Sequence, residues 1–241
     1  MMLSTRLISG VLQFSILIPF VVMSSRVLTR RDLTMISLVF FIFLFDNLQL
    51  DLFSGIVLFK GQQWNWMGKL GSIAWALCFT YLNPILNKKQ IGWTRHFRPH
   101  SCRPAAVFMA LLLGVRGLQY IIFRDGASSF HLESVLFQAT LPGMAEELVY
   151  RGILSGLLAR VWPPQWLFFK AKIGWGVILT SVLFGAVHGL SVDAGFHLHF
   201  QFYTLLITGL WGFAFAVLKE RTGSLIPSMI LHNAVNLIGI H

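Results

Sequence analysis

The segment MAEELVYRGIL, residues 144–154, places two adjacent acids and an arginine inside an apolar stretch of the chain. Glu146, Glu147 and Arg151 carry the charges, and the residues on both sides resemble those of a membrane-spanning helix. Ionisable groups inside a membrane are costly, and they usually mark a functional site. The segment therefore predicts a transmembrane helix that carries reactive side chains.

The rest of the chain has the composition of a membrane protein. Of its 241 residues, 56% are hydrophobic and 12% are charged, and the charged fraction is about half that of an average soluble domain. We expect an all-α, polytopic transmembrane helical bundle of about eight spans, located in the cell membrane and specifically in a bacterial inner membrane. The first span is expected to be retained, because no convincing signal-peptide cleavage site follows it. The expected spans are residues 7–25, 34–59, 66–86, 104–123, 132–158, 173–190, 199–218 and 223–240.

The net charge of +10 does not indicate a nucleic-acid partner, because the basic residues lie in short gaps between apolar segments. Cytoplasmic loops of membrane proteins have this excess of Lys and Arg. One set of alternate loops holds thirteen basic residues: Arg26, Arg30, Arg31, Lys88, Lys89, Arg95, Arg98, Arg103, Arg160, Lys170, Lys172, Lys219 and Arg221. The opposite set holds four: Arg6, Lys60, Lys69 and Arg124. The first set is predicted to be cytoplasmic, with both termini on the other side.

Three of the predicted spans carry polar groups at a similar depth. Measured along the chain from the nearest cytoplasmic basic residue, Glu146, His188 and His232 each lie roughly 16–24 Å away. The pairs Phe184 with His188 and His232 with Asn236 are four residues apart, so each pair shares a helix face. We expect these groups to converge on one site.

The chemistry of these residues fits hydrolysis inside a membrane. Glu147 and Arg151 are also four residues apart and can form an ion pair. Glu146 lies about 100° around the helix from Glu147, which leaves it as the free carboxyl and a candidate general base. His232 and Asn236 can donate hydrogen bonds to a developing oxyanion.

These motifs resemble those of the CPBP family of intramembrane proteases, also called the Abi family. Its best-known relatives are type II CAAX prenyl endopeptidases of the Rce1 kind. The matching residues are Glu146-Glu147-Leu-Val-Tyr-Arg151, Phe184-Gly-Ala-Val-His188 and His232-Asn-Ala-Val-Asn236. The resemblance covers residues 132–240. It implies that 132–241 form the catalytic helical core and that 1–131 are N-terminal helices of the same membrane domain.

The resemblance also implies a glutamate-type endopeptidase that uses neither a metal nor another cofactor. Glu146 and His188 would activate a water, Glu147 and Arg151 would brace the site, and His232 and Asn236 would stabilise the oxyanion. Phe184 would support the site. The partner would be a protein or peptide in or at the lipid bilayer, including one with a modified terminus.

Two other functional classes fit parts of the sequence. A non-catalytic immunity protein that sequesters a membrane peptide would keep the helical bundle but would not need Glu146 as a base. A small transporter would depend on Asp46 or Asp51 in the second span. That span could instead be interrupted, with both acids facing water.

A metal site is the third alternative for the polar residues. His197 and His199 lie close to Asp193, and imidazoles at close spacing can bind zinc. The chain has no His-Glu-x-x-His motif, so we do not expect a catalytic metal.

Overall fold

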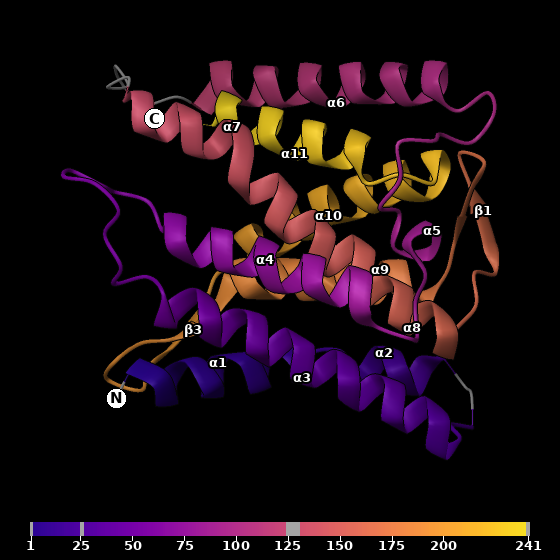
Figure 1. The fold of residues 1–241 in the computed structure, drawn as a ribbon, viewed down its shortest axis with the longest axis horizontal. Helices are drawn as coiled ribbons and strands as arrows, with labels where there is room; N and C mark the ends of the chain where they lie inside the picture. The colour runs from indigo at the N-terminus through magenta and orange to yellow at the C-terminus, as the bar shows by residue number, and fades with distance from the viewer. Residues whose placement is uncertain (1, 25–26, 124–130, 240–241) are drawn as a thin grey trace.

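The structure is a computed structural model that describes residues 2–24, 27–123 and 131–239. Within these ranges the chain is an α-helical bundle with two small β-hairpins (Figure 1). The helices are α1 (Met2–Ser15), α2 (Ile18–Met23), α3 (Arg30–Leu52), α4 (Trp66–Leu82), α5 (Lys88–Ile91), α6 (Cys102–Phe123), α7 (Leu132–Glu146), the π-helix η1 (Glu147–Leu154), α8 (Ser155–Val161), α9 (Trp175–Gly189), α10 (Phe202–Thr222) and α11 (Ile226–Ile238). The hairpins pair β1 (Trp166–Phe168) with β2 (Ala171–Ile173) and β3 (Leu190–Val192) with β4 (Leu198–Phe200), both antiparallel.

The predicted fold class, an all-α bundle of membrane type, is confirmed. Four helical segments of the described chain are long and apolar enough to cross a membrane: Ser4–Met23, Arg30–Leu52, Cys102–Ile122 and Phe202–Thr222. Helices α9 and α11 are apolar but shorter. The count of eight spans stays a prediction.

The second predicted span was placed too far along the chain. Thr29 and Asp32 form a capping box at the start of α3, in which each side chain accepts a hydrogen bond from the other residue's backbone N–H. Helix α3 ends at Leu52, so residues 53–59 lie outside it and belong to the loop that leads to α4. The helix is continuous between these ends, so the alternative of an interrupted second span is wrong.

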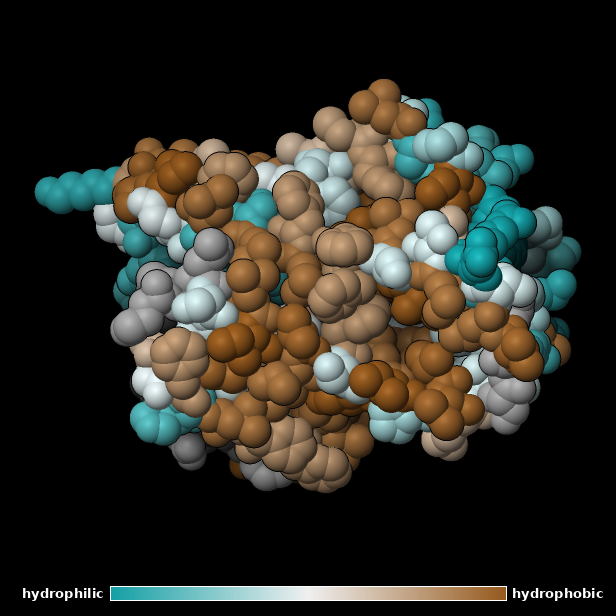
Figure 2. All heavy atoms as spheres, turned by 90° about the horizontal axis from the view of Figure 1, so that it is seen from below, coloured by the Kyte–Doolittle hydropathy of each residue, from teal (hydrophilic) through white to brown (hydrophobic). Residues whose placement is uncertain are grey.

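The outer surface of the bundle is apolar. In Figure 2, hydrophobic side chains cover most of the middle of one face, and hydrophilic side chains gather towards its two ends. Helix α6 also exposes a row of aliphatic residues, among them Val107, Leu111, Val115 and Leu118. A surface of this kind suits contact with lipid tails.

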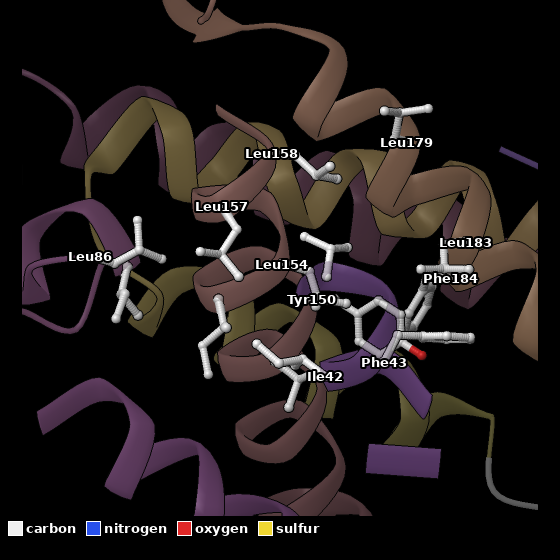
Figure 3. Close-up of a cluster of buried hydrophobic side chains, with 14 of the residues drawn as sticks. Ile42, Phe43, Leu86, Tyr150, Leu154, Leu157, Leu158, Leu179, Leu183 and Phe184 are labelled. Carbon is white, nitrogen blue, oxygen red and sulfur yellow. The ribbon is translucent and has the colours of Figure 1, made fainter. Parts of the chain in front are cut away.

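The core forms around η1 and α8. Leu148, Ile153, Leu154 and Leu157 are fully buried there, and Figure 3 shows part of this cluster with Tyr150 and Phe184 at one side. Helices α9 and α10 approach closely at Gly185, which has no Cβ atom. A Cβ atom there would collide with the carbonyl oxygen of Leu205. Contacts of these two kinds hold the charged segment at the centre of the bundle.

Candidate active site

The acidic segment lies where an α-helix changes to a π-helix. Helix α7 contains Pro142 and ends at Glu146, and the π-helix η1 begins at Glu147. The backbone remains helical through this junction and on into α8. Short π-helical segments inside α-helices are frequent at functional sites, because the extra residue in the turn redirects side chains.

Glu147 and Arg151 form the predicted ion pair. Arg151 Nη1 lies 3.2 Å from Glu147 Oε1, and both side chains are 0% exposed. The guanidinium carbon of Arg151 lies 4.1 Å from the centre of the Phe184 ring, and Arg151 Nε donates to the Gly212 carbonyl oxygen at 3.3 Å. The pair therefore ties η1 to α9 and α10.

His232 joins the two glutamates. Its Nδ1 lies 2.8 Å from Glu147 Oε1, and its Nε2 lies 3.6 Å from Glu146 Oε2. The imidazole stacks on Phe215, with ring centres 4.8 Å apart. Helix α11 thus brings His232 onto the acidic pair, as the shared depth of these residues predicted.

Glu146 is not the free carboxyl that the sequence suggested. Lys69 Nζ lies 2.6 Å from Glu146 Oε1, and the two side chains are only 15% and 17% exposed. The prediction that Lys69 is a loop residue is wrong. Lys69 lies within α4, and its side chain reaches inward to the site. The other carboxylate oxygen, Glu146 Oε2, is buried and has no hydrogen-bond partner among the described residues.

His188 is held in one orientation by its own helix. Its Nδ1 lies 2.7 Å from the carbonyl oxygen of Phe184, and the two rings are in contact with centres 4.7 Å apart. A carbonyl oxygen only accepts hydrogen bonds, so Nδ1 carries the proton and Nε2 of the neutral ring is an acceptor. Phe184 therefore orients His188 as well as covering Arg151.

The site opens into a cavity of about 610 Å³. Glu146, Lys69, His188 and Asn236 line it. No hydrogen bond to the Asn236 side chain comes from the described part of the chain, so its amide is available to a ligand. Trp64, Arg116, Phe137 and Gly239 also line the cavity, together with Ser134 and Gln138.

Asn233 is a site residue that the sequence interpretation left out. The Gly143 N–H donates to Asn233 Oδ1 at 2.8 Å, and Asn233 Nδ2 donates to the Ala139 carbonyl oxygen at 2.9 Å. In a regular α-helix, the N–H of residue 143 would bond to the carbonyl oxygen of residue 139. The Asn233 amide therefore bridges these two groups beside Pro142, and it fastens α7 to α11 one turn before Glu146. A Pro inside an apolar helix and an Asn beside the motif histidine were the available signals.

We expect Gly143→Ala to destabilise this junction by about 1–3 kcal/mol. The new Cβ would lie 2.5 Å from Asn233 Oδ1 and 2.7 Å from the Met229 carbonyl oxygen, which forces α7 and α11 apart. Thermal unfolding in detergent measures the loss. Gly114→Ala is the matched control, because a Cβ there meets nothing within 4 Å; equal melting temperatures for the two variants would contradict the close junction.

The two acids of the second predicted span bind side chains of neighbouring helices. Asp46 is buried and accepts hydrogen bonds from Ser72 at 2.5 Å and from the Trp75 indole at 2.9 Å, which fastens α3 to α4. Asp51 pairs with Arg6 at 2.6 Å and links α3 to α1. Both acids therefore have partners that connect neighbouring helices.

His197, His199 and Asp193 meet at the β3–β4 hairpin. His199 Nε2 lies 2.8 Å from Asp193 Oδ2, and His197 Nδ1 lies 3.4 Å from Asp193 Oδ1. The hydrogen bond from His199 and those from the backbone N–H groups of His197 and Gly195 hold the pKa of Asp193 well below its usual range. No cluster of three or more His, Cys, Asp or Glu residues suited to a metal occurs within residues 2–24, 27–123 and 131–239.

Comparison with known proteins gives one match. Residues 128–238 match the family model described as type II CAAX prenyl endopeptidase Rce1-like. No curated protein matches the chain, and no solved structure does. The matched region contains Glu146, Glu147, Arg151, His188, His232 and Asn236, and it supplies most of the buried polar cluster. The match identifies residues 128–238 as an Rce1-like region and supports the resemblance to the CPBP family.

Proposed function

We propose that the protein is an intramembrane endopeptidase of glutamic type, which hydrolyses a peptide bond in a membrane-associated protein or peptide without a metal. Residues 132–241 would carry the reaction, and the helices of residues 1–131 would complete the cavity. One observation supports this most strongly. Glu146 presents Oε2, which has no hydrogen-bond partner in the described chain, while Lys69 binds the other oxygen.

In the proposed reaction, Glu146 Oε2 and His188 Nε2 hold a water against the substrate carbonyl. Glu146 takes a proton from this water as its oxygen attacks the carbonyl carbon. The tetrahedral intermediate then breaks at the C–N bond, and Glu146 passes the proton to the departing amine. The products are a new carboxylate and a new amine, so water is the only co-reactant.

The oxyanion would be stabilised by Asn236 and His232. The Asn236 amide lines the same cavity as Glu146 and His188, and an amide N–H is a suitable donor to an oxyanion. His232 Nδ1 is committed to Glu147, so donation from Nε2 requires a ring protonated on both nitrogens. Glu147 and Arg151 are positioning residues in this scheme, because they act through His232 and η1.

Lys69 is expected to hold Glu146 in position for this reaction. Lys69→Met removes the 2.6 Å ion pair, and we expect cleavage to fall by about 10²-fold, because small misplacements of a catalytic group cost that much. Lys69→Arg should recover a large part of the rate. The measurement is the cleavage rate of purified variants in detergent, with Lys60→Met as the control. Wild-type rates in Lys69→Met would contradict the role of Lys69.

The proposed function is tested by mapping protein termini in cells that natively express the protein. Cells with the wild type are compared with cells carrying Glu146→Gln at equal expression, by mass spectrometry of the membrane and secreted fractions. New termini that occur only with the wild type would establish a protease and identify its substrate. Identical termini, with candidate substrates detected in both, would refute the protease and favour a peptide-sequestering protein.

A further inference from the structure

The basic residues gather at one end of the bundle. This basic end consists of the starts of α3 and α6, the helix α5, the end of α8, the β1–β2 hairpin and the end of α10, all on the right of Figure 1. These elements and the loops beside them hold all thirteen residues predicted to be cytoplasmic, except that Arg26 lies outside the described residues. Because loops rich in Lys and Arg stay in the cytoplasm, the basic end is the cytoplasmic end.

The cavity opens at the opposite end, which we term the mouth end. Its outer wall is made by Trp64 before α4, Ser134 in the first turn of α7 and Gly239 after α11. These positions lie on the left of Figure 1, where α4 and α7 begin and α11 ends. Glu146 lines the same cavity from the end of α7, and His188 lines it from the last turn of α9.

The mouth has an ordered rim. Glu133 accepts hydrogen bonds from the backbone N–H groups of Gln63 and Trp64 at 3.0 and 3.1 Å and from the Trp66 indole at 3.0 Å. The Trp64 ring stacks on Phe137, with centres 5.2 Å apart and planes 16° apart. Tryptophans concentrate at membrane–water interfaces, so we expect this rim to lie at the level of the lipid headgroups.

We infer that the cavity receives its substrate from the non-cytoplasmic side of the membrane. The substrate is then a polypeptide whose scissile segment has already been translocated, rather than a cytoplasmic protein that associates with the inner surface. The substrate assignment rests on the proposed protease function, whereas the orientation of the cavity rests only on the positions of the basic loops and of the mouth.

The orientation is tested by labelling single cysteines from one side of the membrane. Cys102 is an exposed native cysteine at the basic end. Its counterpart is Gln63→Cys at the mouth end, where residue 63 is exposed and only its backbone bonds to Glu133. Cys78→Ser is included in both proteins, and Cys102→Ser in the mouth variant. The probe is a membrane-impermeant maleimide applied to spheroplasts of a bacterial host.

We expect Gln63→Cys to react in sealed spheroplasts and Cys102 to react only after the membrane is opened with detergent. The reverse pattern, or labelling of both cysteines or of neither in sealed spheroplasts, would overturn the orientation. Once a substrate has been identified, maleimide bound at Gln63→Cys from outside should lower its cleavage at least tenfold. Unchanged cleavage would overturn delivery through this mouth. Identical termini in wild-type and Glu146→Gln cells, with the expected labelling, would refute the protease alone and leave the orientation intact.

Discussion

Replacing Glu146 with glutamine is expected to lower the rate of cleavage by about 10²–10⁴-fold, the usual contribution of a general base. Glutamine has nearly the same shape as glutamate, and its amide oxygen can still accept the hydrogen bond from Lys69, which lies 2.6 Å from Oε1. What is lost is the ability of the second oxygen to take a proton from water. The melting temperature should therefore stay close to that of the wild type. Cleavage of the identified substrate by purified protein in detergent measures the rate.

Glu220→Gln is the matched control for this substitution. Glu220 forms an ion pair with Lys219 at the same distance of 2.6 Å and with a similarly small exposure, but at the basic end of the bundle. Its replacement should leave the cleavage rate unchanged within about twofold, because only Glu146 faces the proposed water. Full activity in Glu146→Gln would refute Glu146 as the base.

Arg151→Met should be the most destabilising of these substitutions, at about 3–5 kcal/mol. It removes the arginine that pairs with Glu147, a residue whose side chain is 0% exposed, and leaves that carboxylate with the contact from His232. For a chain of this length the melting temperature should fall by roughly 6–20 °C. Thermal unfolding in detergent measures the change, and cleavage should fall with it because Glu147 positions His232.

The double variant Glu147→Gln with Arg151→Met separates charge burial from lost packing. Removing both charges should recover more than half of the lost stability, because no unpaired carboxylate remains. Activity should stay low, since the 2.8 Å contact from His232 to a charged Glu147 is gone. If Arg151→Met alone had the melting temperature of the wild type, the ion pair would not stabilise η1.

The helices before residue 132 contribute to the site as well as supporting the motif residues. Lys69 on α4 binds the proposed base, and Arg116 on α6 lines the same cavity. Arg116 Nε donates to the Val235 carbonyl oxygen at 3.3 Å, near the end of α11. The matched family region therefore supplies the motif residues, and the N-terminal helices set the charge and shape around them.

Much of the site could be predicted from the sequence because helical spacing is local. Residues four apart share a helix face, which predicted the pairing of Glu147 with Arg151 and the contact of Phe184 with His188. The common depth of Glu146, His188 and His232 predicted that three helices meet at one point. These inferences need only the rise and turn of a helix.

The partners that lie far apart along the chain could not be predicted in this way. Lys69 is 77 residues from Glu146, and Asn233 is 90 residues from Gly143. Nothing in the spacing of Lys69 distinguishes an inward-facing lysine near a helix start from one in a loop. Its orientation follows from the packing of α4 against α7 and η1.

The sequence by itself determined that this chain is an α-helical membrane bundle with a buried acidic pair, two histidines and an amide on three apolar segments. It did so because hydrophobic length and helical period are properties of consecutive residues. Only the tertiary structure decided that Lys69 binds Glu146 and that the Asn233 amide bonds to the α7 backbone beside Pro142. It also decided that the cavity opens away from the basic end. Those features depend on how helices pack side by side, and packing brings together residues whose distance along the chain carries no information about their contact.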